Sequence, residues 1–252
     1  MRAPQQLTIP RLVALVALAA VLIYLEQKGY LDLGGNTPSS QQSPRPASTE
    51  TVAARPDAAA GAFDYYSLVL SWSPTHCESP EGQDDHPQCT RGRRYAFILH
   101  GLWPQYARGY PEDCPARTRY VPEPVIDRML DIMPSKGLII HEYRKHGTCS
   151  GLSPEGYYDI SRRLFESIEI PARFRNPTEV QFLNPGDVVR EFVSANPQLK
   201  PDMVAVACRG PGSRLREVRI CFSKAGVPRS CGANESQQRL CRGDRMHVPP
   251  VR

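Results

Sequence analysis

The most informative stretch of the sequence is His141-Glu142-Tyr143-Arg144-Lys145-His146-Gly147-Thr148-Cys149. It places two histidines, a carboxylate and an ammonium group within six residues. Apolar residues precede it, and neither Gly nor Pro interrupts it before Gly147. We therefore expect a helix that carries these polar groups and ends near Gly147.

The spacing of the two histidines argues against a zinc-protease helix. That motif needs His-Glu-x-x-His so that both imidazoles reach one metal. His141 and His146 are five residues apart, so on a helix they point about 140° away from each other. Glu142 and His146 instead share a face, as do His141 and Lys145. The spacing predicts proton and charge management, and we expect no metal and no cofactor.

A second polar residue follows an apolar segment upstream. Residues 95–99 contain aromatic and branched side chains, and a Gly and then a Pro follow them. This pattern predicts a buried strand that carries His100 at its end. A single histidine in such a place is usually a hydrogen-bonded structural residue, so the inference of function depends on the two segments together.

Taken together, His100-Gly-Leu-Trp103-Pro and His141-Glu-x-x-Lys-His-Gly-Thr-Cys resemble the two signature segments of the ribonuclease T2 family. Members of this family are secreted endoribonucleases with little base specificity. The resemblance covers roughly residues 63–252. It implies cleavage of single-stranded RNA, with RNA as the partner, through a 2′,3′-cyclic phosphate.

Metal-free RNA cleavage uses the 2′-hydroxyl of the substrate as nucleophile. The protein must remove its proton, protonate the 5′-oxygen that leaves, and stabilise the charge between them. Two imidazoles suit the proton transfers, because groups with a pKa near 6.5 can differ in protonation at the same pH. The resemblance implies that His146 is the base, that His100 is the acid and that His141 contacts phosphate. Glu142 and Lys145 would then orient or stabilise the transition state.

Three residues near His100 are candidates for binding a base. The rings of Trp103 and Tyr106 could stack on any base, although Trp103 could equally be packing that orients His100. Gln105 occupies the position where several family members carry an acidic base-recognition residue. This difference leaves the nucleotide preference open.

The eight cysteines predict disulfides in an oxidising compartment, because their number is even and no Cys-x-x-Cys pair is present. Sequence alone permits 105 pairings. The resemblance implies Cys114–Cys149, Cys208–Cys241 and Cys221–Cys231, which leaves Cys77–Cys89. Cys149 as a nucleophile is an alternative that we disfavour.

Strand and helix patterns alternate imperfectly between residues 63 and 252. Strands are expected over 63–72, 203–208 and 215–222, and helices over 123–133, from Pro154 and from Pro185. We expect an α+β fold in which several helices pack on a mainly antiparallel β-sheet stabilised by disulfides. Residues 63–252 would form this catalytic domain, as a monomer.

The N-terminal segments have a different composition. Residues 12–25 are uncharged and follow two arginines, which predicts an export signal within residues 1–33, either cleaved or retained as a membrane anchor. Residues 34–62 are rich in Pro, Ser and Ala and predict a disordered linker. The protein would be periplasmic or secreted, with a membrane tether through residues 12–25 if the segment is retained.

The net charge of +5 is concentrated at the C-terminus. Residues 200–252 contain 11 Lys and Arg against 4 Asp and Glu. A basic surface attracts polyanions, but it is more often only a solvated face. Two other functions compete with the enzyme: a catalytically silent RNA-binding or interaction protein on the same fold, and a metal-dependent phosphodiesterase, which the helix spacing disfavours.

Overall fold

A six-stranded sheet forms the centre of the fold in the computed structural model, which describes residues 54–55 and 59–252. Its strands follow the order β3-β2-β7-β8-β5, with β6 on β7, and they pair antiparallel except for one contact between β7 and β8. The strands are β2 (Tyr65–Trp72), β3 (Phe97–Gln105), β5 (Gln181–Leu183), β6 (Val204–Arg209), β7 (Arg214–Phe222) and β8 (Met246–Val248). A separate parallel pair joins β1 (Ala54–Arg55) to β4 (Tyr110–Pro111).

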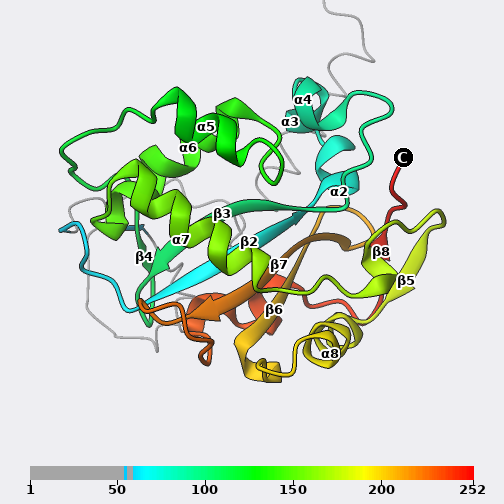
Figure 1. The fold of residues 1–252 in the computed structure, drawn as a ribbon. Coiled ribbons are helices and arrows are strands. Elements are labelled where there is room, and N and C mark those ends of the chain that lie inside the picture. The colour runs from blue at the N-terminus through cyan, green and yellow to red at the C-terminus, as the bar shows by residue number, and fades with distance from the viewer. Residues whose placement is uncertain (1–53, 56–58) are drawn as a thin grey trace, which may run out of the picture. The chain divides into compact units, whose positions relative to one another are not determined.

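Helices cover this sheet and confirm the predicted α+β class. Figure 1 shows α5, α6 and α7 gathered beside β3, and α8 beside β6. The helices are α2 (Ser73–Cys77), α3 (Pro80–Gln83), α4 (His86–Cys89), α5 (Glu123–Met129), α6 (Lys136–Lys145), α7 (Pro154–Glu166), α8 (Pro185–Ala195) and α9 (Gln237–Leu240). Short 3₁₀ turns are η1 (Gly147–Ser150), η2 (Ala172–Phe174), η3 (Pro201–Met203) and η4 (Ala233–Glu235).

Strand β2 lies in the centre of the core, and all its residues are buried. The Trp72 ring at its end packs edge-on against Phe97 and Phe174, with ring centroids 4.8 and 6.1 Å apart. The Trp72 indole N–H donates to the Pro249 carbonyl at 3.1 Å, which satisfies the only polar atom of a fully buried side chain. Aromatic packing therefore fixes the middle of the sheet.

Strand β3 continues past the point where the sequence indicated its end. We expected His100 at the strand terminus, but the strand runs to Gln105, so this prediction was wrong. Because β3 is an edge strand of the sheet, it tolerates Pro104, which lacks a backbone N–H. The register with β2 shifts between Val69 and Leu70, which pair with Gly101 and Leu99. His100 is thus the extra residue of a β-bulge, a feature that re-aims a side chain.

The edge of β3 that does not pair with β2 contacts the helices. The Tyr157 hydroxyl of α7 donates to the Leu102 carbonyl at 2.9 Å and accepts from the Leu102 N–H at 3.2 Å. The Leu99 N–H donates to the Ile132 carbonyl at 2.9 Å. These contacts satisfy backbone groups that an open edge strand would leave unpaired, and they fix α7 and the α5–α6 connection beside the strand that carries His100.

Four disulfides link the fold, and they join the pairs that the resemblance implied: Cys77–Cys89, Cys114–Cys149, Cys208–Cys241 and Cys221–Cys231. The second of these joins η1, directly after α6, to the segment that follows β4. Cross-links of this kind lower the entropy of the unfolded chain. The cystines fit an oxidising compartment.

The N-terminal predictions fall largely outside the described residues, which include neither the export segment 1–33 nor most of the linker 34–62. Inside the predicted linker, Ala54–Arg55 pairs with β4, and the Gly61 N–H donates to the Cys149 carbonyl at 2.9 Å. The boundary at residue 63 stays a prediction. Among the residues that the structure describes, no helix is both long and apolar enough to span a bilayer.

Candidate active site

A cavity of about 500 Å³ lies where α6, β3, β7 and the C-terminal segment converge. All five predicted catalytic residues line it. Its lining comprises His100, Trp103, Gln105, Tyr110, His141, Glu142, Lys145, His146, Arg216, Arg219, Asn234, Arg239 and Leu240. The two signature segments, although separate in sequence, therefore form one site.

Helix α6 ends at the residue that we propose as the base. His146 caps the helix, and its N–H donates to the Glu142 carbonyl at 2.9 Å. The predicted end of the helix near Gly147 is confirmed. The chain then continues as η1, which ends at Gly151 in a left-handed conformation with φ of 76°. Gly147 is required because an added Cβ would lie 2.5 Å from the Tyr143 ring. Close packing thus sets the backbone after His146.

Glu142 lies between the two histidine-bearing segments. Its side chain is only 1% exposed; Oε1 lies 3.4 Å from His100 Nε2, and Oε2 accepts from the Trp103 indole N–H at 2.7 Å. Gly101 leaves the space for this contact, because a Cβ there would lie 2.0 Å from Glu142 Oε2 and 2.8 Å from Trp103 Nε1. The glycine beside His100 therefore allows the helix carboxylate to reach the strand.

Trp103 contacts both histidines. Its ring stacks on His146, with centroids 4.9 Å apart, and meets His100 edge-on at 5.4 Å. The Arg219 guanidinium lies over the same indole, 4.8 Å from the ring centroid. These contacts favour the reading in which Trp103 positions the histidines; base stacking by this ring stays a prediction.

The two imidazoles have pKa values shifted in opposite directions. Burial lowers the pKa of His146 to about 4, although Glu142 partly opposes this effect. Burial also lowers the pKa of His100, but the carboxylates of Glu142 and Glu217 outweigh it, so the pKa of His100 lies above its ordinary value. The shifts thus favour the neutral form of His146 and the protonated form of His100.

Glu142 remains charged in this environment. Burial raises the pKa of Glu142, but His100, His146 and the Trp103 N–H lower it by more, so its pKa lies below the ordinary value. A buried carboxylate with these partners can hold a positive imidazole without itself taking the proton. The Glu142 side chain thus fits an orienting and charge-balancing role.

Lys145 and His141 lie on the part of α6 that lines the cavity. The Lys145 ammonium lies 3.1 Å from Glu112 Oε2, and this hydrogen bond raises the pKa of Lys145. The lysine therefore stays protonated, although an arriving phosphate would compete with Glu112 for it. His141 is exposed and also lines the cavity.

Of the predicted base-binding residues, Trp103 and Gln105 line the cavity and Tyr106 does not. Gln105 lines the cavity but is buried, and its Oε1 accepts from the Asn234 side-chain amide at 2.9 Å. Tyr106 is not among the lining residues and packs against the hydrophobic core. Asn234 also donates to the Tyr106 and Gly109 carbonyls at 3.1 and 2.8 Å. The amide pair of Gln105 and Asn234 thus forms one wall of the cavity.

Sequence reasoning missed the contribution of β7 and the C-terminal segment. Arg216 and Arg219 line the cavity from β7, and Arg239 lines it from α9. They belong to the C-terminal excess of positive charge, which was too diffuse to assign to a site. A usable signal was the run Arg214-Leu-Arg-Glu217-Val-Arg219, because charges are unusual inside an otherwise apolar strand.

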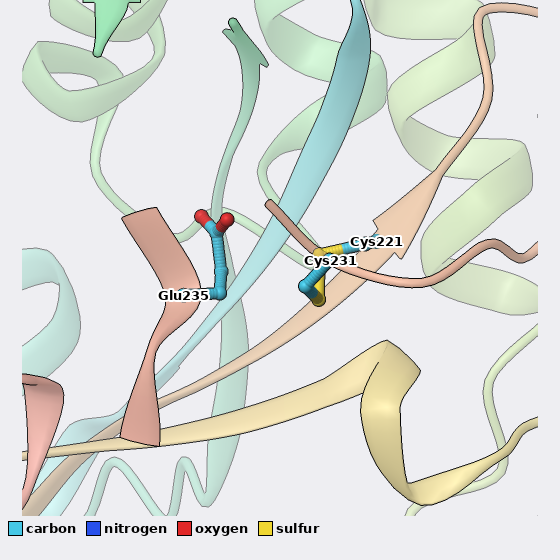
Figure 2. A group of neighbouring side chains, drawn as sticks. All are labelled: Cys221, Cys231 and Glu235. Atoms are coloured by element: carbon cyan, nitrogen blue, oxygen red, sulfur yellow. A yellow bond between two sulfur atoms is a disulfide. The ribbon is translucent and has the colours of Figure 1, made fainter. Parts of the chain in front are cut away.

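One group of potential metal ligands occurs in the described part of the chain: Cys221, Cys231 and Glu235, whose ligand atoms lie within 4.8 Å of one another. Figure 2 shows the two cysteines joined as a disulfide, with an S–S distance of 2.01 Å. Bonded sulfurs cannot act as thiolate ligands, and the Glu235 carboxylate accepts from the Tyr65 hydroxyl. These residues do not fit a metal.

Comparison with known proteins agrees with the geometry. Residues 63–231 match the model of the ribonuclease T2 family. A ribonuclease of Aeromonas hydrophila is 36% identical over 181 residues, which are 71% of this chain and 81% of that protein. Ribonuclease I of Escherichia coli is 25% identical over 215 residues, covering 69% and 80% of the two chains.

Solved structures show the same fold at lower identity. Trichomaglin, described as an S-like ribonuclease, superposes with a TM-score of 0.60 at 22% identity, over 75% of this chain and 99% of its own. An RNase-related protein from Calystegia sepium gives a TM-score of 0.57 at 21% identity, over 75% and 98%.

The fold and the site therefore define an endoribonuclease whose substrate is RNA. The chain belongs to the ribonuclease T2 family.

Proposed function

We propose that this enzyme cleaves single-stranded RNA with low base specificity by metal-independent transphosphorylation. His146 removes the proton of the 2′-hydroxyl, and the 2′-oxygen forms a bond to phosphorus. The bond from phosphorus to the 5′-oxygen breaks as His100 protonates that oxygen. The products are a 2′,3′-cyclic phosphate and a 5′-hydroxyl end, and water can then open the cyclic phosphate.

The observation that carries this proposal is the opposite pKa shift of two imidazoles that face one cavity. The pKa of His146 falls to about 4, which suits a base, and the pKa of His100 is raised, which suits an acid. Each proton transfer typically contributes about 10²- to 10⁴-fold to the rate. The reverse assignment would make His100 the base and His146 the acid, against the direction of both pKa shifts.

The remaining side chains stabilise the negative charge of the phosphorane or orient His100. Lys145 and Arg216 line the cavity and supply positive charge where the phosphorane becomes more negative, and His141, which also lines it, contacts the phosphate. Removing one such donor typically costs about 3 to 4 kcal/mol of transition-state stabilisation. Glu142 holds His100 and Trp103, which keeps the acid in the orientation that proton transfer requires.

The compartment follows from the disulfides and the N-terminal segment. We infer that residues 12–25 direct export to the periplasm or the outside of the cell, where the four cystines persist. The segment is either removed or kept as a membrane tether, and the catalytic domain acts as a monomer. Fractionation of cells with N-terminal sequencing distinguishes the two forms.

Identification of the product ends tests the reaction. The full-length protein is incubated with single-stranded homopolymer RNA beside a His146→Ala variant. The proposal predicts 2′,3′-cyclic phosphate and 5′-hydroxyl ends, with at least about a 10²-fold slower reaction for the variant. A binding protein without turnover would leave the RNA intact, and 5′-phosphate ends would exclude the 2′-hydroxyl as nucleophile.

A further inference from the structure

Glu217 is a buried carboxylate of β7 that the reaction scheme leaves unused. Its side chain has no exposed surface, and no hydrogen bond within the described structure reaches its Oε1. A charged carboxylate in such a place is costly unless positive groups surround it. The neighbours of the Glu217 carboxylate are Arg216, Arg219 and His100, and they stabilise its charge.

The two oxygens of Glu217 have different partners. Oε2 accepts from Arg219, from Nε at 3.1 Å and from Nη2 at 2.9 Å. Oε1 lies 3.0 Å from Arg216 Nε and 3.8 Å from His100 Nδ1. Oε2 thus accepts two N–H groups of one guanidinium, and Oε1 lies between Arg216, its nearer neighbour, and the His100 imidazole.

Strand register explains how residues on two different strands meet. β3 and β7 both pair with β2, so His100 and Glu217 are separated by the middle strand. Glu217 pairs with Ser71 of β2, which has a small side chain. The bulge at His100 removes that residue from the regular alternation. The His100 imidazole therefore reaches across β2 to within 3.8 Å of the Glu217 carboxylate.

We propose that Glu217 is a positioning residue whose charge orients the Nδ1 side of His100. The N–H at Nε2, which lies 3.4 Å from Glu142 Oε1 and so beyond a normal hydrogen bond, is then the one that protonates the 5′-oxygen. The inference rests on the proposed role of His100 as the acid. A role only as the counter-ion of Arg216 and Arg219 would not require Oε1 to lie within 3.8 Å of His100 Nδ1 as well. Arg219 also has a second carboxylate nearby, because its Nη1 lies 3.9 Å from Glu235 Oε1.

Charged groups from two elements face His100. Glu142 and His146 approach from α6 and its C-terminal cap, and Glu217 and Arg216 approach from β7. The two carboxylates favour the imidazolium, whereas Arg216 and a protonated His146 oppose it. Removing the charge of Glu217 shifts this balance toward the neutral ring, without touching Glu142.

The test measures His100 directly and then through activity. The titration of the His100 imidazole is followed by NMR in the full-length protein and in Glu217→Gln, with His100→Ala to assign the signal. We expect the His100 pKa to fall by about one unit in Glu217→Gln. The alkaline limb of the pH profile of kcat/KM should move to lower pH by the same amount, which is about a tenfold loss above that limb.

Glu235→Gln is the matched control. It also changes a buried carboxylate near Arg219 to an amide, but within the described structure Glu235 forms no ion pair with His100, unlike Glu142 and Glu217. It should leave the His100 titration unchanged. An unchanged titration in Glu217→Gln, or an equal shift in both variants, would overturn the proposal. A shifted titration with an unmoved alkaline limb would keep the contact but show that His100 is not the acid.

Glu217→Asp covers the case in which the amide variant does not fold. It keeps the charge but moves it farther from the ring, so the His100 pKa should lie between those of the wild type and an uncharged variant. Circular dichroism establishes that the variant is folded. A titration identical to that of the wild type would contradict a role that depends on the position of this carboxylate.

Discussion

The Trp103 indole stacks on the His146 imidazole, with ring centroids 4.9 Å apart and planes inclined by 27°, and it donates its N–H to Glu142. One side chain of β3 therefore contacts the proposed base and also holds the carboxylate beside the proposed acid. The relative placement of His100 and His146 depends on this ring.

Trp103→Phe removes the hydrogen bond to Glu142 but keeps an aromatic ring beside His146. The phenyl ring can still stack on His146, but Glu142 loses its indole donor. A hydrogen bond to a charged group is worth about 1.5–3 kcal/mol, so we expect kcat to fall by about 10- to 10²-fold. Steady-state kinetics on a dinucleotide check this. If KM rises and kcat stays constant, the ring binds the base and does not position the histidines.

A methyl group at Gly101 should displace Glu142. The added Cβ would lie 2.0 Å from Oε2 of that carboxylate, so Gly101→Ala should reduce kcat/KM by at least about 10²-fold, because a displacement of about 1 Å can cost this much. Gly137→Ala is the control. Gly137 lies on α6, the helix that carries Glu142, and its added Cβ would meet nothing closer than 3.8 Å. Wild-type activity in Gly101→Ala would show that the Glu142 contact is dispensable.

The Cys114–Cys149 disulfide should affect activity as well as stability. Cys149 lies three residues after His146, so removing the bridge by a double Ala substitution loosens the backbone that carries the base. We expect a loss of about 2–5 kcal/mol in unfolding free energy together with a lower kcat. The Cys77–Cys89 double variant, whose cysteines lie on α2 and α4 and not next to His146 in the chain, should lose stability with less effect on kcat. Equal kcat losses would refute the local link.

Removal of divalent metals should leave the reaction intact. The lining groups are imidazole, ammonium, guanidinium, amide and one carboxylate that already holds His100. The chemistry that we propose uses these groups alone, so cleavage of homopolymer RNA in excess EDTA should proceed at the untreated rate. A requirement for added zinc or magnesium would exclude this mechanism.

Much of the site could be predicted because its groups are close together in sequence. The helix around Glu142 and His146 follows from local periodicity, and the two signature segments carry the family resemblance. The place of His100 within β3 could not be predicted, because Gly101 and Pro104 resemble the end of a strand. Only the tertiary structure shows that β3 is an edge strand, where these residues are tolerated.

The contribution of β7 was missed for a different reason. The charged run of this strand is a local signal, but the place of Arg216 and Arg219 at the cavity depends on the long-range pairing of β7 with β2. The three-residue strands β5 and β8 are too short to leave a signal of their own. Local sequence thus indicated the reacting groups, whereas their surroundings depend on strand order and register.

The pH dependence of kcat/KM on single-stranded RNA, measured in EDTA, tests the central claim most directly. The base must be neutral, so activity should rise as pH increases through about 4, the lowered pKa of His146. The acid must be protonated, so activity should fall as pH increases through the pKa of His100, which lies above the ordinary histidine value. The account predicts this bell-shaped profile. A rate that keeps rising past pH 9, or that shows no acidic limb, would contradict it.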